Sequence, residues 1–288
     1  MPSAHLYLLL GMPSHCLASL TVILLICLCA VCNIILLILC SILLMLYSHK
    51  KSLNVPKRVA EMLHNKEQSY ITRKTFDFLS SCREVSIVAV TARTMAQYDR
   101  VYKLLNCLHS EYALILNGAV LLKNGLQDKS WLENSIREVR NSEPEMNIAK
   151  KLLEYYGDKP VRYSDRFLTY IDAADPPKLL EHLECCIDSN LINTFCDSRK
   201  VYCVPTAINK GTAVTKFKKQ FETGVTVGVG DSMNDLSMLE SVDIPIIPHS
   251  MACYVSNPNK IVVAKSEVLS DAACDEISKL IKSDIGSC

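Results

Sequence analysis

An eight-residue segment at 228–235, with the sequence Gly-Val-Gly-Asp-Ser-Met-Asn-Asp, constrains the fold of this chain more than any other. It separates a β-branched run at 225–229 from a helix-like run at 236–241, which predicts a strand, a sharp turn and a helix. The two aspartates then lie at the carboxyl end of a buried strand, where open α/β sheets bind ligands. Because Mg²⁺ prefers oxygen ligands, we predict a metal site here. Its predicted ligands are Asp231 and Asp235, and its supporting residues are Ser232 and Asn234.

A turn followed by an N-capped helix explains the same residue types without a metal, because Asp, Ser and Asn all cap helices well. The position of the segment directly after a buried-looking strand favours the metal site over this simpler explanation.

Two further segments suggest an anion site. A buried-looking strand at 85–90 ends at Thr91, and a helix is expected at 95–108. A hydroxyl and free backbone N–H groups at a helix N-terminus suit an anion, although a threonine there is also an ordinary cap. Lys210 stands at the start of another expected helix, at 212–221, where a cation opposes the helix dipole. We therefore treat Thr91 and Lys210 as candidate phosphate-binding residues.

Charge and cysteine content exclude some functions. The 288 residues carry a net charge of +1, and no basic helix with interleaved aromatic residues is present, so we predict no nucleic-acid partner. No protein partner can be identified from the sequence. Fourteen cysteines are scattered along the chain, and the one Cys-x-x-Cys pair, at 29–32, lacks a second half, so a zinc site is improbable. Free thiols in a reducing compartment are the expectation.

The N-terminal region is strongly apolar. Residues 16–47 contain no charged side chain, and a helix of about 20 apolar residues spans a bilayer. Basic residues follow at 49–58, so the positive-inside rule predicts one transmembrane helix with the C-terminal domain in the cytoplasm. Two alternatives remain open. Residues 34–46 could form a strand of the core, or the run is not native coding sequence and the protein is cytoplasmic.

Between the two halves of the expected α/β core lies a segment of mixed character. Residues 130–156 have helical composition with a break at Pro144, and 191–195 with 200–204 predict a hairpin. Such a segment suits an α+β lid that excludes water and selects substrate. Ahead of the core, residues 57–64 are expected to form a short helix.

The segment at 230–235 resembles the fourth motif of haloacid-dehalogenase-type phosphatases, in the capped branch that includes sucrose-phosphate and Cof-like phosphatases. Thr91-Ala92-Arg93 is similar to the second motif, with alanine in place of its usual glycine. Asn209-Lys210-Gly211 is similar to the third. The resemblance implies an α/β fold with a Rossmann-like core and an inserted cap. The implied domains are an N-terminal hydrophobic segment at 1–50, a core at 51–120 and 201–288, and a cap at 121–200.

The resemblance also implies roles. Thr91 would bind the phosphoryl group, Lys210 would neutralise its charge, and Asn234 would orient the lysine or the carboxylates. The implied activity is Mg²⁺-dependent hydrolysis of a small phosphate monoester such as a sugar phosphate, with Asp231 and Asp235 holding the metal. Besides this substrate, the implied partner is the membrane, through the N-terminal helix.

One motif of the family is absent. Its phosphatases use an aspartate nucleophile and a second aspartate two residues later as acid and base, but this chain has no aspartate before Asp77. Two alternatives to the enzyme therefore stay open: a catalytically inactive protein that binds phosphate and metal, and a truncated gene product.

Overall fold

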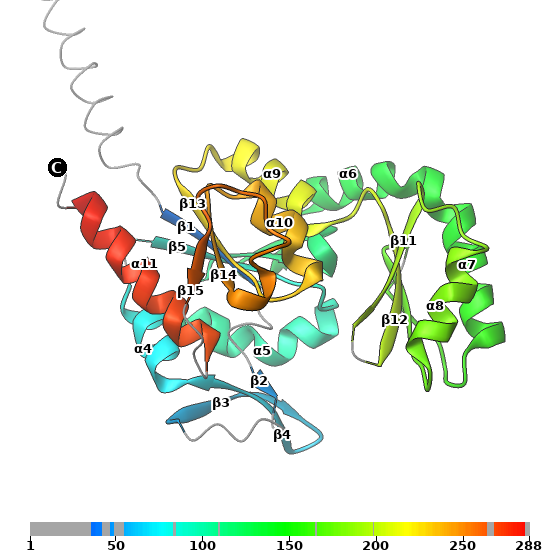
Figure 1. Cartoon of the computed structure of the whole chain (residues 1–288), viewed down its shortest axis with the longest axis horizontal. Coiled ribbons are helices and arrows are strands. Elements are labelled where there is room, and N and C mark those ends of the chain that lie inside the picture. The colour runs from blue at the N-terminus through cyan, green and yellow to red at the C-terminus, as the bar shows by residue number, and fades with distance from the viewer. Residues whose placement is uncertain are drawn as a thin grey trace, which may run out of the picture.

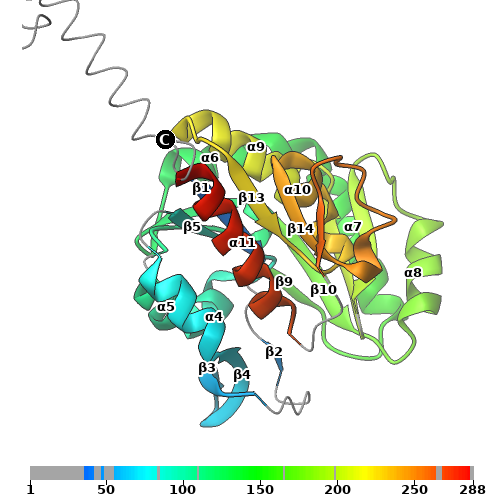
Figure 2. The same cartoon turned by 60° about the vertical axis from the view of Figure 1, so that its left-hand side comes forward.

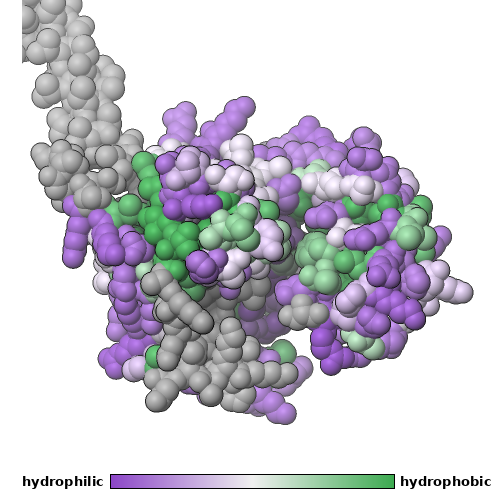
Figure 3. All heavy atoms as spheres, in the orientation of Figure 1, coloured by the Kyte–Doolittle hydropathy of each residue, from purple (hydrophilic) through white to green (hydrophobic). Residues whose placement is uncertain are grey.

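The computed structural model describes residues 36–41, 47–48, 55–82, 85–108, 110–164, 166–197, 199–263 and 268–285. These residues form a large α/β core, a smaller α+β cap beside it and a short three-stranded sheet below the core (Figure 1). Polar side chains cover much of the face seen in Figure 1, as Figure 3 shows.

The core is built on an eight-stranded sheet with the order β15-β14-β13-β1-β5-β6-β7-β8. The strands from β15 to β6 are parallel, whereas β7 and β8 run antiparallel to their neighbours. The strands are β1 Leu36–Ser41, β5 Val85–Val90, β6 Tyr112–Ile115, β7 Val120–Lys123, β8 Leu126–Gln127, β13 Thr226–Val229, β14 Ile244–Pro248 and β15 Ile261–Val263.

The central position of the sheet is held by β1, which comes from the apolar N-terminal run. Ile38 is in register with Val227 of β13 on one side and with Ile87 of β5 on the other. The structure thus supports a core strand within 34–46, and these six residues are not part of a membrane-spanning helix. The rest of the predicted transmembrane segment, up to residue 35, lies outside the described residues. Within the described ranges, no helix is long and apolar enough to cross a membrane.

Helices cover both faces of the core sheet (Figures 1 and 2). On one face, Leu79, Val101 and Ile277 come from three different helices and pack with Ile87 and Val227 of the sheet. On the other, a second apolar cluster joins the remaining core helices to β5, β6 and β14. The first set comprises α4 Arg73–Ser81, α5 Met95–Cys107 and α11 Leu269–Ile285, and the second α9 Lys210–Phe221 and α10 Leu236–Ser241.

A small antiparallel sheet, with the order β2-β4-β3, precedes the first core helix. The predicted helix at 57–64 is wrong, because β3 occupies this segment and pairs with β4 across a tight turn. His64 and Asn65 have φ of 50° and 59°, and this left-handed backbone lets Leu63 face Lys66. The strands are β2 Tyr47–Ser48, β3 Lys57–Leu63 and β4 Lys66–Thr72.

The cap contains a four-stranded antiparallel sheet with the order β11-β12-β10-β9, and α7 and α8 cover one of its faces. The predicted hairpin is present as β11 and β12. The predicted break is also present, because α6 ends at Val139 and Pro144 lies in the first turn of the next helix, α7. The strands β7 and β8, which fall in the range predicted for the cap, pair in the core sheet. The elements are α6 Lys129–Val139, η2 Arg140–Ser142, α7 Glu143–Tyr156, β9 Arg162–Ser164, β10 Leu168–Asp172, α8 Pro176–Glu184, β11 Ile192–Asp197 and β12 Lys200–Pro205.

Candidate active site

The carboxyl ends of four neighbouring parallel strands bring the predicted site residues to one edge of the core sheet. Thr91 directly follows β5, and the 3₁₀ turn η1, Leu116–Gly118, follows β6. Asp231 follows β13 after one glycine. Between them ends β1, whose last residue Ser41 is in register with Val90 of β5. The chain leaves β1 toward β5 and returns, after the cap, to β13 on the other side of β1. This change of direction is where open α/β sheets bind ligands.

Thr91 is fully buried and tied to the turn after β6. Its N–H donates to the Leu114 carbonyl at 2.8 Å, and its own carbonyl accepts from the Asn117 N–H at 2.9 Å. Its hydroxyl oxygen accepts from the Arg93 N–H at 3.2 Å. Among the described residues the hydroxyl hydrogen has no acceptor, so Thr91 can donate it to an anion.

Lys210 and Asp235 form a buried ion pair. Lys210 Nζ lies 2.5 Å from Asp235 Oδ1, and each side chain is 1% exposed. The pair forms because α9, which begins at Lys210, packs closely against α10. Gly211 makes this approach possible, since a Cβ there would lie 2.3 Å from the Ser237 carbonyl oxygen. The lysine therefore brings a fixed positive charge to the carboxyl edge of the sheet.

The other oxygen of Asp235 is also engaged by the protein. Oδ2 accepts from the Ser232 hydroxyl at 2.7 Å, from the Ser232 N–H at 3.2 Å and from the Asp231 N–H at 3.3 Å. Burial alone raises the pKa of the Asp235 carboxyl, but the charge of Lys210 and these hydrogen bonds outweigh it. The pKa of this carboxyl is therefore below its ordinary value, and the group is ionised at neutral pH.

These contacts decide how a metal fits. Asp235, one of the two predicted ligands, has protein donors on both oxygens, whereas the Asp231 side chain is exposed. In the described part of the chain no three His, Cys, Asp or Glu side chains are grouped to hold a metal. Mg²⁺ commonly keeps several waters and needs only one or two carboxylates together with a substrate phosphate. The residues thus fit a Mg²⁺ held by Asp231, water and phosphate, with Asp235 holding Lys210 instead.

The central strand contributes no carboxylate to this edge. Ser41 ends β1 beside the segment that leads into Thr91, and the next three residues in the sequence are Ile42, Leu43 and Leu44.

A cavity of about 670 Å³ lies between this edge and the cap sheet. Asn234 borders it, and its orienting role stays a prediction. Asn193, Phe195 and Asp197 alternate along β11 and reach the cavity from the cap. The period-2 pattern could have indicated this common face, but not which way it points. The lining residues are Asn117, Asn193, Phe195, Cys196, Asp197, Val204, Thr206, Ile208, Asn209, Ser232, Met233, Asn234, Leu236 and Ser237.

The lining of this cavity combines polar and apolar side chains, and no cationic side chain is found among the described residues that form it. Its polar groups are mainly amides, hydroxyls and one carboxylate. Phe195 adds an aromatic face that stacks on Tyr202 with ring centroids 5.1 Å apart. Such a lining suits an uncharged molecule rich in hydroxyl groups.

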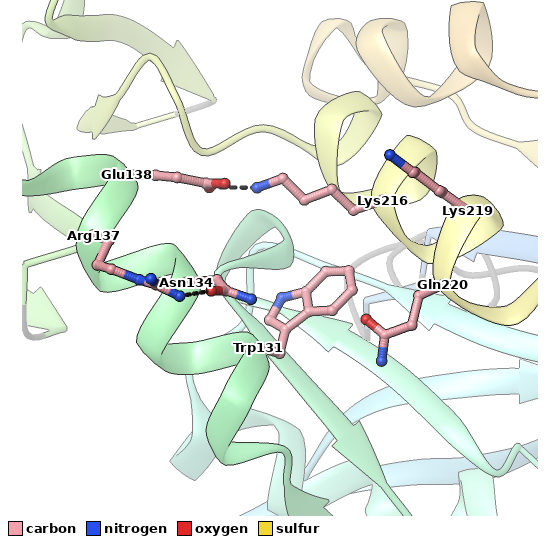
Figure 4. Close-up of a pocket in the computed structure, with 7 residues that line it drawn as sticks. All are labelled: Trp131, Asn134, Arg137, Glu138, Lys216, Lys219 and Gln220. Atoms are coloured by element: carbon pink, nitrogen blue, oxygen red, sulfur yellow. Dashed lines mark hydrogen bonds and ion pairs between the residues drawn. The ribbon is translucent and has the colours of Figure 1, made fainter.

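A second hollow, of about 770 Å³, lies between α6 and α9 (Figure 4). Lys216 forms an ion pair with Glu138 there, and Arg137 donates to the side-chain oxygen of Asn134. It contains none of the predicted site residues, so we do not assign the substrate to it.

Comparison with known proteins finds similarity to a family of hydrolases. A family model described as haloacid dehalogenase-like hydrolase matches residues 126–268. A glucosyl-3-phosphoglycerate/mannosyl-3-phosphoglycerate phosphatase from Persephonella marina is 52% identical over 54 residues, which is 17% of this chain. The match spans only 20% of that phosphatase, so its substrates do not transfer directly.

Solved structures share the fold over most of the chain. A sucrose-phosphatase from Synechocystis sp., in complex with sucrose and phosphate, superimposes with a TM-score of 0.60 and 15% identity, covering 86% of this chain and 98% of that one. A haloacid-dehalogenase-superfamily phosphatase from Bacteroides thetaiotaomicron gives 0.52 and 12%, covering 85% and 95%. At these identities the likeness shows the fold alone.

Proposed function

We propose that this chain acts on the phosphate monoester of a small sugar, because residues 126–268 match a family model of haloacid dehalogenase-like hydrolases and the fold is shared with a sucrose-phosphatase. The observation that carries the proposal is the buried Lys210–Asp235 pair, set at the sheet edge where Thr91 also lies. The Lys210 ammonium and the Thr91 hydroxyl can bind a phosphoryl group, and the neighbouring cavity can bind an uncharged group rich in hydroxyls.

In this proposal each residue has a binding role. Thr91 donates a hydrogen bond to the phosphoryl group, Lys210 neutralises part of its charge, and Asp235 holds Lys210 in place. Asp231 holds Mg²⁺, which would supply further charge neutralisation when bound. Hydrolysis breaks the ester bond with water and releases the sugar and inorganic phosphate. We assign no nucleophile, because the aspartate that fills this role in the family has no counterpart in the chain.

A second candidate is a protein that binds sugar phosphates without hydrolysing them. The central strand ends at Ser41 and is followed by three apolar residues, so it offers no carboxylate to attack phosphorus.

One experiment with the full chain in detergent distinguishes the enzyme from the binding protein. The full chain is necessary because a fragment starting at residue 48 would lack β1, the central strand. Release of inorganic phosphate from p-nitrophenyl phosphate and hexose 6-phosphates would be measured with Mg²⁺, beside thermal unfolding with and without inorganic phosphate.

Turnover that Asp231→Asn abolishes and Asp99→Asn leaves intact supports the enzyme. Asp99 is a matched control, since it is an exposed aspartate on α5 away from the cavity. A thermal shift without turnover supports the binding protein, and neither signal from folded protein overturns both candidates.

A further inference from the structure

We propose that the side-chain amide of Asn117 contacts the sugar part of the substrate, next to the phosphate ester. This inference rests on the proposed function and adds a specificity-determining residue to its site. Asn117 is 5% exposed and borders the cavity, yet its Oδ1 has no hydrogen-bond partner among the described residues. Buried acceptors are nearly always paired, so a ligand that enters the cavity is a natural source of the missing donor.

The position of Asn117 fixes which part of a ligand it would meet. Its N–H donates to the Thr91 carbonyl at 2.9 Å, and the preceding Leu116 N–H donates to the Arg93 carbonyl at 3.0 Å. The turn η1 is therefore bonded directly to the segment from Thr91 to Arg93, which contains the candidate phosphate-binding threonine. The same cavity is bordered by Ser232 and Asn234, beside the candidate metal ligand. Asn117 thus lies between the phosphate site and the sugar cavity.

The chemistry of an amide suits a sugar hydroxyl. A hydroxyl can donate to Oδ1 and accept from Nδ2, and a half-turn of the amide exchanges the two atoms. An anionic group could accept a hydrogen bond from Nδ2 but has no hydrogen to donate to Oδ1. Since the part of the lining that the structure describes contains no lysine or arginine, a neutral hydroxyl is the better match.

Asparagine at position 117 could also serve the backbone conformation alone, and the test must distinguish this role from ligand binding. Asn117 has φ 55° and ψ 26°, a left-handed conformation that Asn and Gly adopt more readily than other residues. Asn117→Gly retains this backbone freedom and removes the side chain with its amide. Asn124 is the matched control, because it also has a left-handed backbone, with φ 49°, but lies exposed in the β7–β8 turn outside the cavity.

The test compares binding of glucose 6-phosphate, mannose 6-phosphate and inorganic phosphate by calorimetry, using the full chain and the variants Asn117→Gly and Asn124→Gly. We expect Asn117→Gly to weaken binding of the hexose phosphate about tenfold, the loss of roughly one hydrogen bond. Inorganic phosphate should bind all three proteins equally, which also reports that the site remains folded.

Unchanged hexose phosphate binding by Asn117→Gly overturns the contact, as does an equal loss for hexose phosphate and inorganic phosphate. In both cases the proposed function survives through the binding of the unaltered chain. If the unaltered chain binds neither hexose phosphate, the proposed function falls and this inference falls with it.

Discussion

Lys210 Nζ lies 2.5 Å from Asp235 Oδ1 in a place that water does not reach, since both side chains are 1% exposed. The pair joins the start of α9 to the turn after β13, two segments that are 25 residues apart in the sequence. Each charge is tolerated there only because the other is present. The pair therefore has a structural and an electrostatic consequence that experiments can separate.

Asp235→Asn should lower the free energy of unfolding by about 3–5 kcal/mol, because it leaves the Lys210 charge buried and uncompensated. The double variant Lys210→Met with Asp235→Leu should recover much of that loss, but not the affinity for phosphate. Urea unfolding measures the first effect and calorimetry with inorganic phosphate the second. An Asp235→Asn protein with an unchanged urea midpoint would contradict the role of the pair.

Glu61 provides a pH-dependent link between the small sheet and the core. Its carboxylate accepts from Arg93 at 2.9 and 3.1 Å and from Arg100 Nε at 2.7 Å, and from the Ser69 hydroxyl at 3.1 Å. Burial raises the pKa of Glu61, but the bonds and charges of the two arginines outweigh it, so its pKa falls from 4.5 to about 2.

A lowered pKa in the folded state stabilises the protein above the unfolded pKa, and this contribution is lost as the pH falls toward the folded value. Glu61 should thus contribute on the order of 3 kcal/mol at neutral pH, which declines between about pH 4.5 and 2. The difference in free energy of unfolding between the unaltered chain and Glu61→Gln, followed by urea titrations across this range, should shrink accordingly. A difference that stays constant from pH 7 to 3 would argue against the ion pairs.

Gly211→Ala should destabilise the protein although the residue lies in a helix. In an ordinary helix this change gains up to about 1 kcal/mol. Here the added Cβ would lie 2.3 Å from the Ser237 backbone oxygen, so α9 must move away from α10 at a cost of about 1–3 kcal/mol. The movement also displaces Lys210, so weaker phosphate binding should accompany the lower thermal midpoint. A higher midpoint would show that the two helices pack less tightly than described.

The sequence predicted the carboxyl edge of the sheet well, because strand, turn and residue type coincide at Thr91 and Asp231. It could not show that Asp235 is bonded to Lys210. A carboxylate that follows a strand looks the same whether it binds metal or a buried lysine, and only the packing of α9 on α10 distinguishes them. The apolar run was ambiguous for a similar reason, since a central parallel strand buried on both faces is as apolar as a membrane segment. Register with β5 and β13 places Leu36–Ser41 in the sheet.

The charge of the cavity predicts which leaving groups the protein accepts. Asp197 borders the cavity, and none of the described lining residues is lysine or arginine, so a ligand with a carboxylate near the cap should bind less well than a neutral one. We expect glucose 6-phosphate to bind more tightly than 6-phosphogluconate, an open-chain acid with a carboxylate at the end remote from the phosphate. Asp197→Asn should reduce this preference by about fivefold at low salt and by less at 0.15 M salt, because the side chain is exposed and screened. Asp99→Asn removes the same charge away from the cavity and should leave the preference unchanged. Competition calorimetry with the two ligands measures the ratio, and equal ratios in all three proteins would remove Asp197 from the specificity of the site.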